Sequence, residues 1–278
     1  EGRVTSVEGR KDHPFTRGTL CVKVKNYQDR VYSPDRLLYP QKRVGAKGEG
    51  HFEPISWQEA LNTIKERFGA VIEGFGPEAI LPCSYIGQQG FAHGLNSWDA
   101  FFNRLGASIM ERTLCASAAN SASVMTTGVS AGVDPLSFVH SRFILIWGCN
   151  TISTHMHQWP MIAEAQRKGA KVVVIDPIRS RTAAKADWHI QIRPGTDAAL
   201  ALGMINVIIS KGLLDHDYVE KYTVGFDALK ERAAQYSLKR VSEITGLSEE
   251  VVNTLALEYA GIQPSVIRVG VAIERHRR

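Results

Sequence analysis

The order of strands and helices between Phe143 and Gly203 constrains the fold of this chain more than any other stretch. One apolar segment runs FILIWGCN, a second runs KVVVIDPIRSR, and a third, HIQIRPGTD, leads into DAALALGMINVII. Strands that alternate with helices in this way form βαβ units around a parallel sheet. We therefore predict an α/β fold with Rossmann-like parallel-sheet domains.

Each of these strands stops on Gly, Asn, Asp or Pro, so polar turns and a helix N-terminus should gather at the carboxyl edge of the sheet. Such edges bind nucleotides, because free backbone N–H groups and the helix dipole favour phosphate. The GxGxxG fingerprint of ordinary NAD sites is absent. Asp176 ends a strand, where an acidic residue holds a ribose hydroxyl or simply caps a turn, and both interpretations stand.

Local patterns predict further elements along the chain. Ser56 and Glu59 form a capping box, which predicts a helix from about Trp57 to Glu73. A strand over 79–83 and a helix carrying Trp98 and Phe102 should follow. Later helices are expected over 158–168, 197–210, 215–222, 226–236 and 249–260, and a last strand over 265–271.

Composition narrows the class of protein. The 278 residues are 44% hydrophobic and 22% charged, as in a packed protein with room for two domains. No apolar run approaches the roughly 20 residues that span a bilayer. The net charge of +5 is dispersed, which does not indicate a nucleic-acid site. The four cysteines stand far apart without a CxxC pair, so no zinc or disulfide framework is expected.

Several motifs in the right order carry a resemblance. They are WGCN, the turn IDPIRSRT and the segment ADWHIQIRPGTDAALALGM, with HPFTRGTLCVKV, YSPDRLLYPQKRVG and GEGHFEPISWQEAL upstream and GLLDHDYVEKYTVGF downstream. Together they closely resemble the molybdopterin oxidoreductases of the dimethyl sulfoxide reductase superfamily over essentially the whole chain. The resemblance implies a fragment that lacks the N-terminal cysteines and the C-terminal domains.

The resemblance also implies three domains. Residues 1–52 would be the remnant of a small β-rich 4Fe-4S domain. Residues 53–118 and 263–278 would form an incomplete first α/β domain, and residues 119–262 an inserted α/β domain that binds a guanine dinucleotide. The early segment, with its short strands and turns rich in Gly, Pro, Arg and Lys, agrees with the first of these assignments.

Three residues would serve the redox centres. Taken alone, Cys115 is typical of a small buried apolar residue. The resemblance implies instead that it binds molybdenum or tungsten, and a thiolate suits a soft, redox-active metal. Cys21 resembles the fourth cysteine of the 4Fe-4S cluster, which is incomplete in this chain. Lys23 matches a lysine between cluster and pterin; without the family match it would be an exposed strand lysine.

The implied cofactor is molybdenum, or tungsten, bound to two molybdopterin guanine dinucleotides. The family pattern places a shared set of turn residues around the dinucleotides: Gln88, Trp147, Gly148, Cys149, Asn150, Asp176, Pro177, Arg179, Ser180, Gly195, Thr196 and Asp197. The carboxylate of Asp197 would hold a guanine edge, although Thr-Asp at a helix start is also good capping chemistry. The resemblance decides that assignment.

Histidines near these segments leave other chemistry open. His93 is a candidate for proton transfer. His155 and His157 fit polar loop or helix-start positions better than a metal site, because no carboxylate or cysteine stands at ligand spacing. Formate dehydrogenases of the superfamily have a histidine after the metal-binding residue, where this chain has Ala116. That departure weakens an assignment as a formate dehydrogenase.

The resemblance implies an enzyme that moves two electrons, with an oxygen atom or hydrogen, and relays electrons through the 4Fe-4S cluster. Formate, nitrate, polysulfide, thiosulfate or an organic S- or N-oxide would fit as substrate. Two alternatives stand: a degenerate electron-transfer subunit like the large iron-sulfur subunit of NADH dehydrogenases, and a non-redox hydratase. An iron-sulfur partner subunit, and a membrane anchor subunit with it, are implied. The compartment, cytoplasm or periplasm of a prokaryote, stays open.

Overall fold

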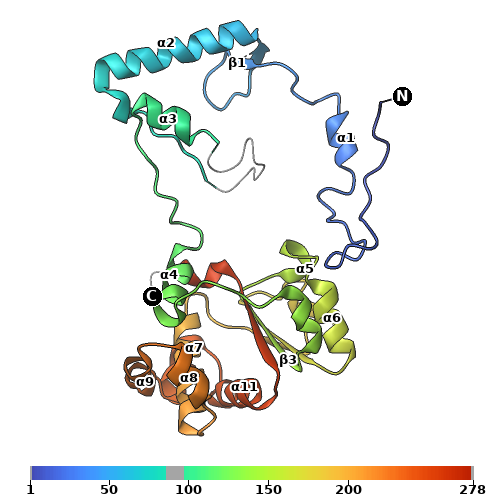
Figure 1. Ribbon diagram of the computed structural model, residues 1–278, viewed down its shortest axis with the longest axis vertical. Coiled ribbons are helices and arrows are strands. Elements are labelled where there is room, and N and C mark those ends of the chain that lie inside the picture. Colours follow the sequence, from blue (N-terminus) through green and yellow to red (C-terminus); the bar gives the residue numbers. More distant parts are fainter. Residues whose placement is uncertain (1, 86–96, 277–278) are drawn as a thin grey trace. The chain divides into compact units, whose positions relative to one another are not determined.

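The computed structural model describes residues 2–85 and 97–276, which fall into two compact units (Figure 1). Unit 1 combines residues Glu1–Ser6 with Asn26–Arg112, and unit 2 combines Val7–Lys25 with Thr113–Arg278. These boundaries differ from those of the three predicted domains, which stay a prediction. No helix among the described residues is long and apolar enough to cross a membrane.

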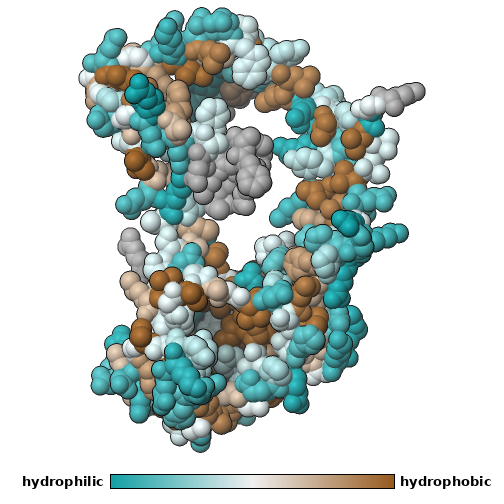
Figure 2. All heavy atoms as spheres, in the orientation of Figure 1, coloured by the Kyte–Doolittle hydropathy of each residue, from teal (hydrophilic) through white to brown (hydrophobic). Residues whose placement is uncertain are grey.

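Unit 1 consists of short elements and one long helix. Its elements are α1 (Tyr27–Val31), β1 (Gln41–Arg43), β2 (Phe52–Pro54), α2 (Trp57–Phe75), η1 (Pro77–Ala79) and α3 (Asp99–Leu105). β1 and β2 pair as an antiparallel hairpin. No described residue of these helices and strands is buried. Unit 1 therefore has little core of its own, and Figure 2 shows apolar side chains at its surface.

The capping box predicted for α2 is confirmed at the helix start. The Ser56 hydroxyl accepts a hydrogen bond from the Glu59 backbone N–H at 3.1 Å, and the helix begins at Trp57. The predicted strand over 79–83 is wrong. Pro77–Ala79 is a 3₁₀ turn, and Ile80 accepts a single backbone bond from Ser108 N–H at 2.9 Å. A strand needs a ladder of such bonds, which this stretch does not form.

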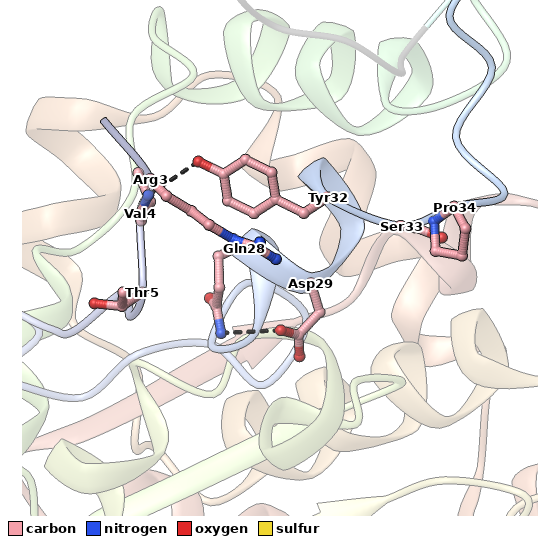
Figure 3. A pocket seen from close by; sticks show the side chains of 8 residues that line it. All are labelled: Arg3, Val4, Thr5, Gln28, Asp29, Tyr32, Ser33 and Pro34. Carbon is pink, nitrogen blue, oxygen red and sulfur yellow. Dashed lines mark hydrogen bonds between the residues drawn. The ribbon is translucent and has the colours of Figure 1, made fainter. Parts of the chain in front are cut away.

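A small pocket of unit 1 lies between its N-terminal stretch and α1 (Figure 3). The Arg3 guanidinium stands 4.6 Å from the centre of the Tyr32 ring, and the Val4 N–H donates to the Tyr32 hydroxyl at 2.9 Å. The Gln28 amide donates to the carboxylate of the next residue in α1, Asp29, at 3.4 Å. These contacts hold the N-terminal stretch against α1.

A four-stranded parallel sheet forms the centre of unit 2. Its strands are β3 (Phe143–Trp147), β4 (Lys171–Ile175), β5 (Trp188–Ile190) and β6 (Ser265–Val269), in the order β5-β4-β3-β6. The predicted α/β class with a parallel sheet is thereby confirmed. β6 pairs with β3 over five residues, although the family resemblance implied that residues 263–278 belong to a different domain from residues 119–262.

Helices cover both faces of this sheet, so its strands are apolar on both sides. Leu145 and Trp147 point to a core shared with α7 (Asp197–Ser210), α10 (Leu238–Thr245) and α11 (Glu249–Gly261). Ile144 and Ile146 point to a second core with α6 (Trp159–Arg167) and η2 (Pro135–His140). The four strand residues are at most 4% exposed. The strands are thus fixed in register on both faces.

All five predicted helices of unit 2 are confirmed, with ends that differ by at most two residues. α7 has the predicted bounds, and α6, α8 (His216–Tyr222), α9 (Phe226–Ala234) and α11 lie where the apolar spacing placed them. α10 was not predicted; Ser237 caps it by accepting from Arg240 N–H at 3.3 Å. The small-residue run after Cys115 forms α4 (Ser117–Thr127). The remaining elements are α5 (Thr151–Thr154), η3 (Ala183–Lys185) and η4 (Val271–Glu274).

Candidate functional site

The turns after β3 and β4 meet at the carboxyl edge of the sheet, as expected for parallel neighbours. The Thr182 hydroxyl donates to the Asn150 side-chain oxygen at 2.9 Å and accepts from the Ile152 N–H at 3.0 Å. Thr182 is fully buried and lies two residues past the predicted set. It joins the two turns, and the only sequence signal for it was its place in the motif IDPIRSRT.

The second turn is held by its own side chains. Asp176 is 9% exposed and accepts from the Ile178 N–H at 3.0 Å, while Ser180 accepts from the Ala183 N–H at 3.2 Å. Gln191 donates to the Pro177 carbonyl at 2.9 Å. Arg179 is exposed at the surface of the same turn. The capping interpretation of Asp176 is therefore confirmed, and its role toward a ribose stays a prediction.

The turn at residues 195–197 also contacts the end of β3, through Trp147. The indole N–H of Trp147 donates to the Asp197 carboxylate at 2.7 Å, which fixes that carboxylate at the first turn of α7. The Thr196 hydroxyl donates to the Arg193 carbonyl at 2.7 Å and so shapes the turn without capping the helix. Gly195 adopts a φ of 76°, a left-handed conformation that favours glycine. The structure thus brings Trp147, Gly195, Thr196 and Asp197 together.

An open cavity of about 530 Å³ lies beside this pair of side chains. Trp147 and Asp197 line it together with apolar residues from α7, β6 and the segment that follows β6. A cavity of this size, mostly apolar and lined by the carboxylates of Asp197 and Glu274, suits a planar heterocycle that donates hydrogen bonds from its edge. Cys149 lies elsewhere: its side chain is 7% exposed in the second core, 3.6 Å from the Thr151 hydroxyl.

The segment Gly270–His276 crosses the carboxyl edge of the sheet, and no sequence motif predicted a functional role for it. Gly270 donates to the Trp147 carbonyl at 2.8 Å, and a Cβ on Gly270 would lie 1.9 Å from the Gly148 carbonyl oxygen. A Cβ on Gly148 would in turn meet Ile273 at 2.7 Å. Only glycine fits where these two segments of the chain approach each other so closely. His276 then lies against Gly195.

This segment reaches Cys115. Cys115 is partly buried just before α4, and its sulfur lies 3.3 Å from the Arg275 guanidinium. The Glu274 carboxylate accepts from the Ala119 N–H in the first turn of α4. The predicted metal ligand and the predicted nucleotide turns therefore belong to one unit and are linked by residues 270–276.

Cys21 and Lys23 lie in a separate turn of unit 2. The Cys21 carbonyl accepts from the backbone N–H groups of Val24 and Lys25 at 2.9 and 3.1 Å. Cys21 is partly buried and Lys23 is exposed, and neither side chain makes a hydrogen bond to another described residue. Their roles at an iron-sulfur cluster stay a prediction.

An ion pair attaches the stretch that precedes Cys21 to α6, a helix that packs on the second core. Arg17 donates to Glu164 of α6 at 2.8 Å, and Lys168 donates to the same carboxylate at 2.7 Å. Lys168 first and Arg17 second lower the pKa of Glu164 from its usual 4.5 to about 2. The carboxylate therefore stays ionised in the folded protein down to acid pH.

A Glu164→Gln variant should lose a pH-dependent part of stability. Because the pKa of Glu164 is lower in the folded protein, its pairs stabilise the fold above pH 4.5, and this contribution disappears as the pH falls toward about 2. The difference in melting temperature between wild type and variant should be largest near neutral pH and small at the acid end. Glu231→Gln on α9 is the control, and equal pH profiles for both variants would contradict the assignment.

The remaining candidate residues are Gln88, His93, His155 and His157. Gln88 and His93 lie outside the described residues. His155 and His157 pack near the Phe15 ring, with centroids 6.3 and 6.4 Å away. Burial first, and the charge of Arg268 second, lower the pKa of His155. No three His, Cys, Asp or Glu side chains among residues 2–85 and 97–276 gather as a metal site. Cys115 therefore stands as a single candidate ligand.

The residues fit a nucleotide-containing cofactor with a metal bound by one protein thiolate. The Cys115 sulfur lies 3.3 Å from the Arg275 guanidinium, and a cysteine sulfur is a ligand that suits a soft, redox-active metal. The fixed carboxylate of Asp197 faces a cavity large enough for a base. The close approach of Gly270 to Gly148 links the Cys115 sulfur and this cavity within unit 2. The fold and site thus define an α/β protein in which a cysteine and a cavity lined by Asp197 lie in the same unit, at the carboxyl edge of a parallel sheet.

Comparisons with known proteins agree with this class. Residues 36–278 match the molybdopterin oxidoreductase family, and residues 1–33 match its Fe4S4 domain. The chain belongs to the molybdopterin oxidoreductase family, which implies a molybdopterin cofactor and a 4Fe-4S cluster. The resemblance stated from the sequence motifs is thereby confirmed.

Individual relatives are of several kinds. The probable oxidoreductase YoaE of Bacillus subtilis is 44% identical over 99% of this chain and 41% of its own length. Acetylene hydratase of Syntrophotalea acetylenica is 35% identical over 100% of this chain and 38% of its own length. The dimethyl sulfoxide reductase DmsA of Escherichia coli is 30% identical over 92% and 35%. The chain thus spans about two fifths of such relatives.

The fold is also that of a solved relative. The structure of acetylene hydratase from Pelobacter acetylenicus matches with a TM-score of 0.75 and 34% identity, over 94% of this chain and 36% of that protein. Relatives therefore include both named reductases and a named hydratase.

Proposed function

We propose that the protein binds a bis(molybdopterin guanine dinucleotide) cofactor of molybdenum or tungsten, and that Cys115 supplies the protein ligand to the metal. The observation that carries this proposal is the link, through residues 270–276, between the Cys115 sulfur and the Trp147–Asp197 cavity. A cofactor that carries both a metal and a nucleotide needs two such places in one rigid unit. Membership of the family implies a molybdopterin cofactor. These residues support the proposal that this cofactor carries guanine dinucleotides.

Each residue group has a distinct task. Trp147 holds the Asp197 carboxylate, which would accept two hydrogen bonds from the edge of a guanine. Asn150 and Thr182 lock the turns after β3 and β4, and Ser180 closes the second turn. Cys21 would hold one corner of the 4Fe-4S cluster, and Lys23 would offer a positive charge near it. The protein thereby binds and orients a cofactor whose own chemistry is two-electron transfer.

The proposed reaction is the reduction or oxidation of a small molecule by two electrons. Reduction of an organic S-oxide, for example, takes two electrons and two protons, breaks the S–O bond and releases the sulfide and water. The electrons would pass one at a time through the 4Fe-4S cluster to or from a partner subunit. Formate, nitrate, polysulfide, thiosulfate and organic S- or N-oxides are the proposed substrate classes.

A second candidate function is hydration without electron flow, and the similarity to acetylene hydratase over the whole chain favours it. A degenerate electron-transfer subunit is less well supported, because Cys115 and the Asp197 turn are both present. Viologen dye assays separate the first two. Oxidation of reduced dye that depends on an oxide, or reduction of oxidised dye by formate, supports the redox enzyme. Conversion of acetylene without any change of dye would favour the hydratase and contradict the redox proposal.

An Asp197→Asn variant should bind the guanine dinucleotide more weakly. The guanine edge offers two donors, and asparagine presents only one acceptor in place of the carboxylate. A hydrogen bond to a charged group contributes about 1.5–3 kcal/mol. The affinity for the guanine dinucleotide should therefore fall by roughly 10- to 150-fold. The measurement is GMP released per chain after acid hydrolysis, with Asp227→Asn on α9 as control. Equal GMP content in all three proteins would contradict the role of Asp197.

A further inference from the structure

We propose that Arg275 is the positioning residue for Cys115 and sets the charge around the metal that this cysteine would hold. The inference rests on the proposed function. Arg275 donates from one guanidinium nitrogen to the Cys115 sulfur at 3.3 Å and to the Cys115 carbonyl at 3.5 Å. One side chain that contacts both the sulfur and the backbone of a residue restricts the direction in which that sulfur points.

The way in which the backbone of Arg275 is held explains how its side chain can position Cys115. η4 precedes it, and η4 is anchored by Gly270 on the Trp147 carbonyl and by Ile273 on Gly148. Ile273 also packs against the core that contains Trp147. The backbone of Arg275 is tied to η4 through its N–H, which donates to the Ala272 carbonyl at 3.2 Å. The backbone of Arg275 is therefore held in place by its links to the sheet. Its long side chain extends from this fixed position.

Glu274 acts on the same segment from the next position. Its carboxylate accepts from the Ala119 N–H, one of the backbone donors that has no partner within α4. An acidic group at a helix N-terminus is also favoured by the helix dipole. Two adjacent residues of opposite charge thus hold both sides of the short stretch 115–119. This pair fixes the start of α4 relative to the end of β6.

The charge of Arg275 has a consequence for redox chemistry. The guanidinium of Arg275 carries a positive charge, which lies next to the sulfur. A positive charge beside a metal ligand stabilises the more electron-rich state of the centre. Removing it should make the metal harder to reduce. Arg275 would thereby tune the potential through Cys115 without touching the substrate.

The test uses the purified, cofactor-loaded protein and its Arg275→Gln and Arg275→Lys variants. Redox titration followed by electron paramagnetic resonance of the metal gives the midpoint potential and the signal shape. Arg275→Gln should disfavour reduction about tenfold in the one-electron equilibrium, which is about 59 mV toward negative potential. Arg275→Lys keeps the charge but replaces the planar guanidinium by an ammonium on a shorter side chain, so its potential should stay near that of wild type while its signal shape changes.

Arg142→Gln is the matched control, because Arg142 precedes β3 at the amino edge of the sheet, away from Cys115. Its potential and signal should equal those of wild type. If Arg275→Gln keeps the wild-type potential and signal at full metal content, the inference is wrong while the proposed function stands. If the wild-type protein itself holds no molybdenum or tungsten, the proposed function fails first. The two failures are therefore distinguishable.

Discussion

Replacing Cys115 by alanine should reduce substrate-dependent turnover by more than about 100-fold. Loss of groups that only support a metal ligand costs 10- to 100-fold, and loss of the ligand itself should cost more. The variant should still fold, because Cys115 is partly exposed and lies outside both buried cores of unit 2. Turnover per chain, measured with a viologen dye and the best substrate, is the readout.

Two further variants show whether the loss comes from the metal. Cys115→Ser keeps an oxygen at the ligand position and should retain some metal with an altered paramagnetic signal. Cys83→Ala removes an exposed cysteine of unit 1 and should leave turnover and signal unchanged. Wild-type turnover and an unaltered metal signal in Cys115→Ala would exclude this cysteine as the ligand.

Replacing Leu145 by alanine should destabilise unit 2 by about 2–5 kcal/mol, because it opens a cavity in a close-packed core. Leu145 is fully buried in the central strand β3, between β4 and β6 and under α7 and α11. The midpoint of chemical unfolding should fall accordingly. At moderate denaturant the variant should also lose cofactor, since β3 carries Trp147 to the carboxyl edge.

Leu213→Ala is the control for that prediction, because Leu213 is 41% exposed beyond the end of α7. Its midpoint should stay close to that of wild type. A Leu145→Ala protein as stable as wild type would contradict the placement of β3 at the centre of the core.

Much of unit 2 could be predicted because its sequence signals are local and agree with one another. The strand pattern at 143–147 and 171–175, and the apolar spacing at 197–210, reflect burial on fixed faces. The stretch over 79–83 is apolar enough for a strand, but a strand exists only where a neighbour completes its hydrogen-bond ladder. That neighbour cannot be read from the stretch itself, which is why this prediction is wrong.

The site was predicted only in part for a similar reason. The turns near Asn150, Asp176 and Asp197 carry polar residues directly after apolar strands, which is a visible signal. The contacts of Arg275 and Glu274 depend on how closely Gly270 approaches Gly148, more than a hundred residues earlier in the chain. Such a crossing leaves no periodic pattern. The sequence therefore drew attention to these polar turns and to Cys115, whose roles stay predictions, but not to the segment that links them.

The content of metal and pterin in the purified wild-type protein, expressed at the full length of its gene, tests the central claim most directly. Molybdenum, tungsten and iron would be measured by mass spectrometry, and pterin and GMP by chromatography after release. The account predicts about one molybdenum or tungsten, about two pterins with their guanine nucleotides, and about four irons per chain. Iron without molybdenum, tungsten or pterin would contradict it and leave an electron-transfer subunit as the better description.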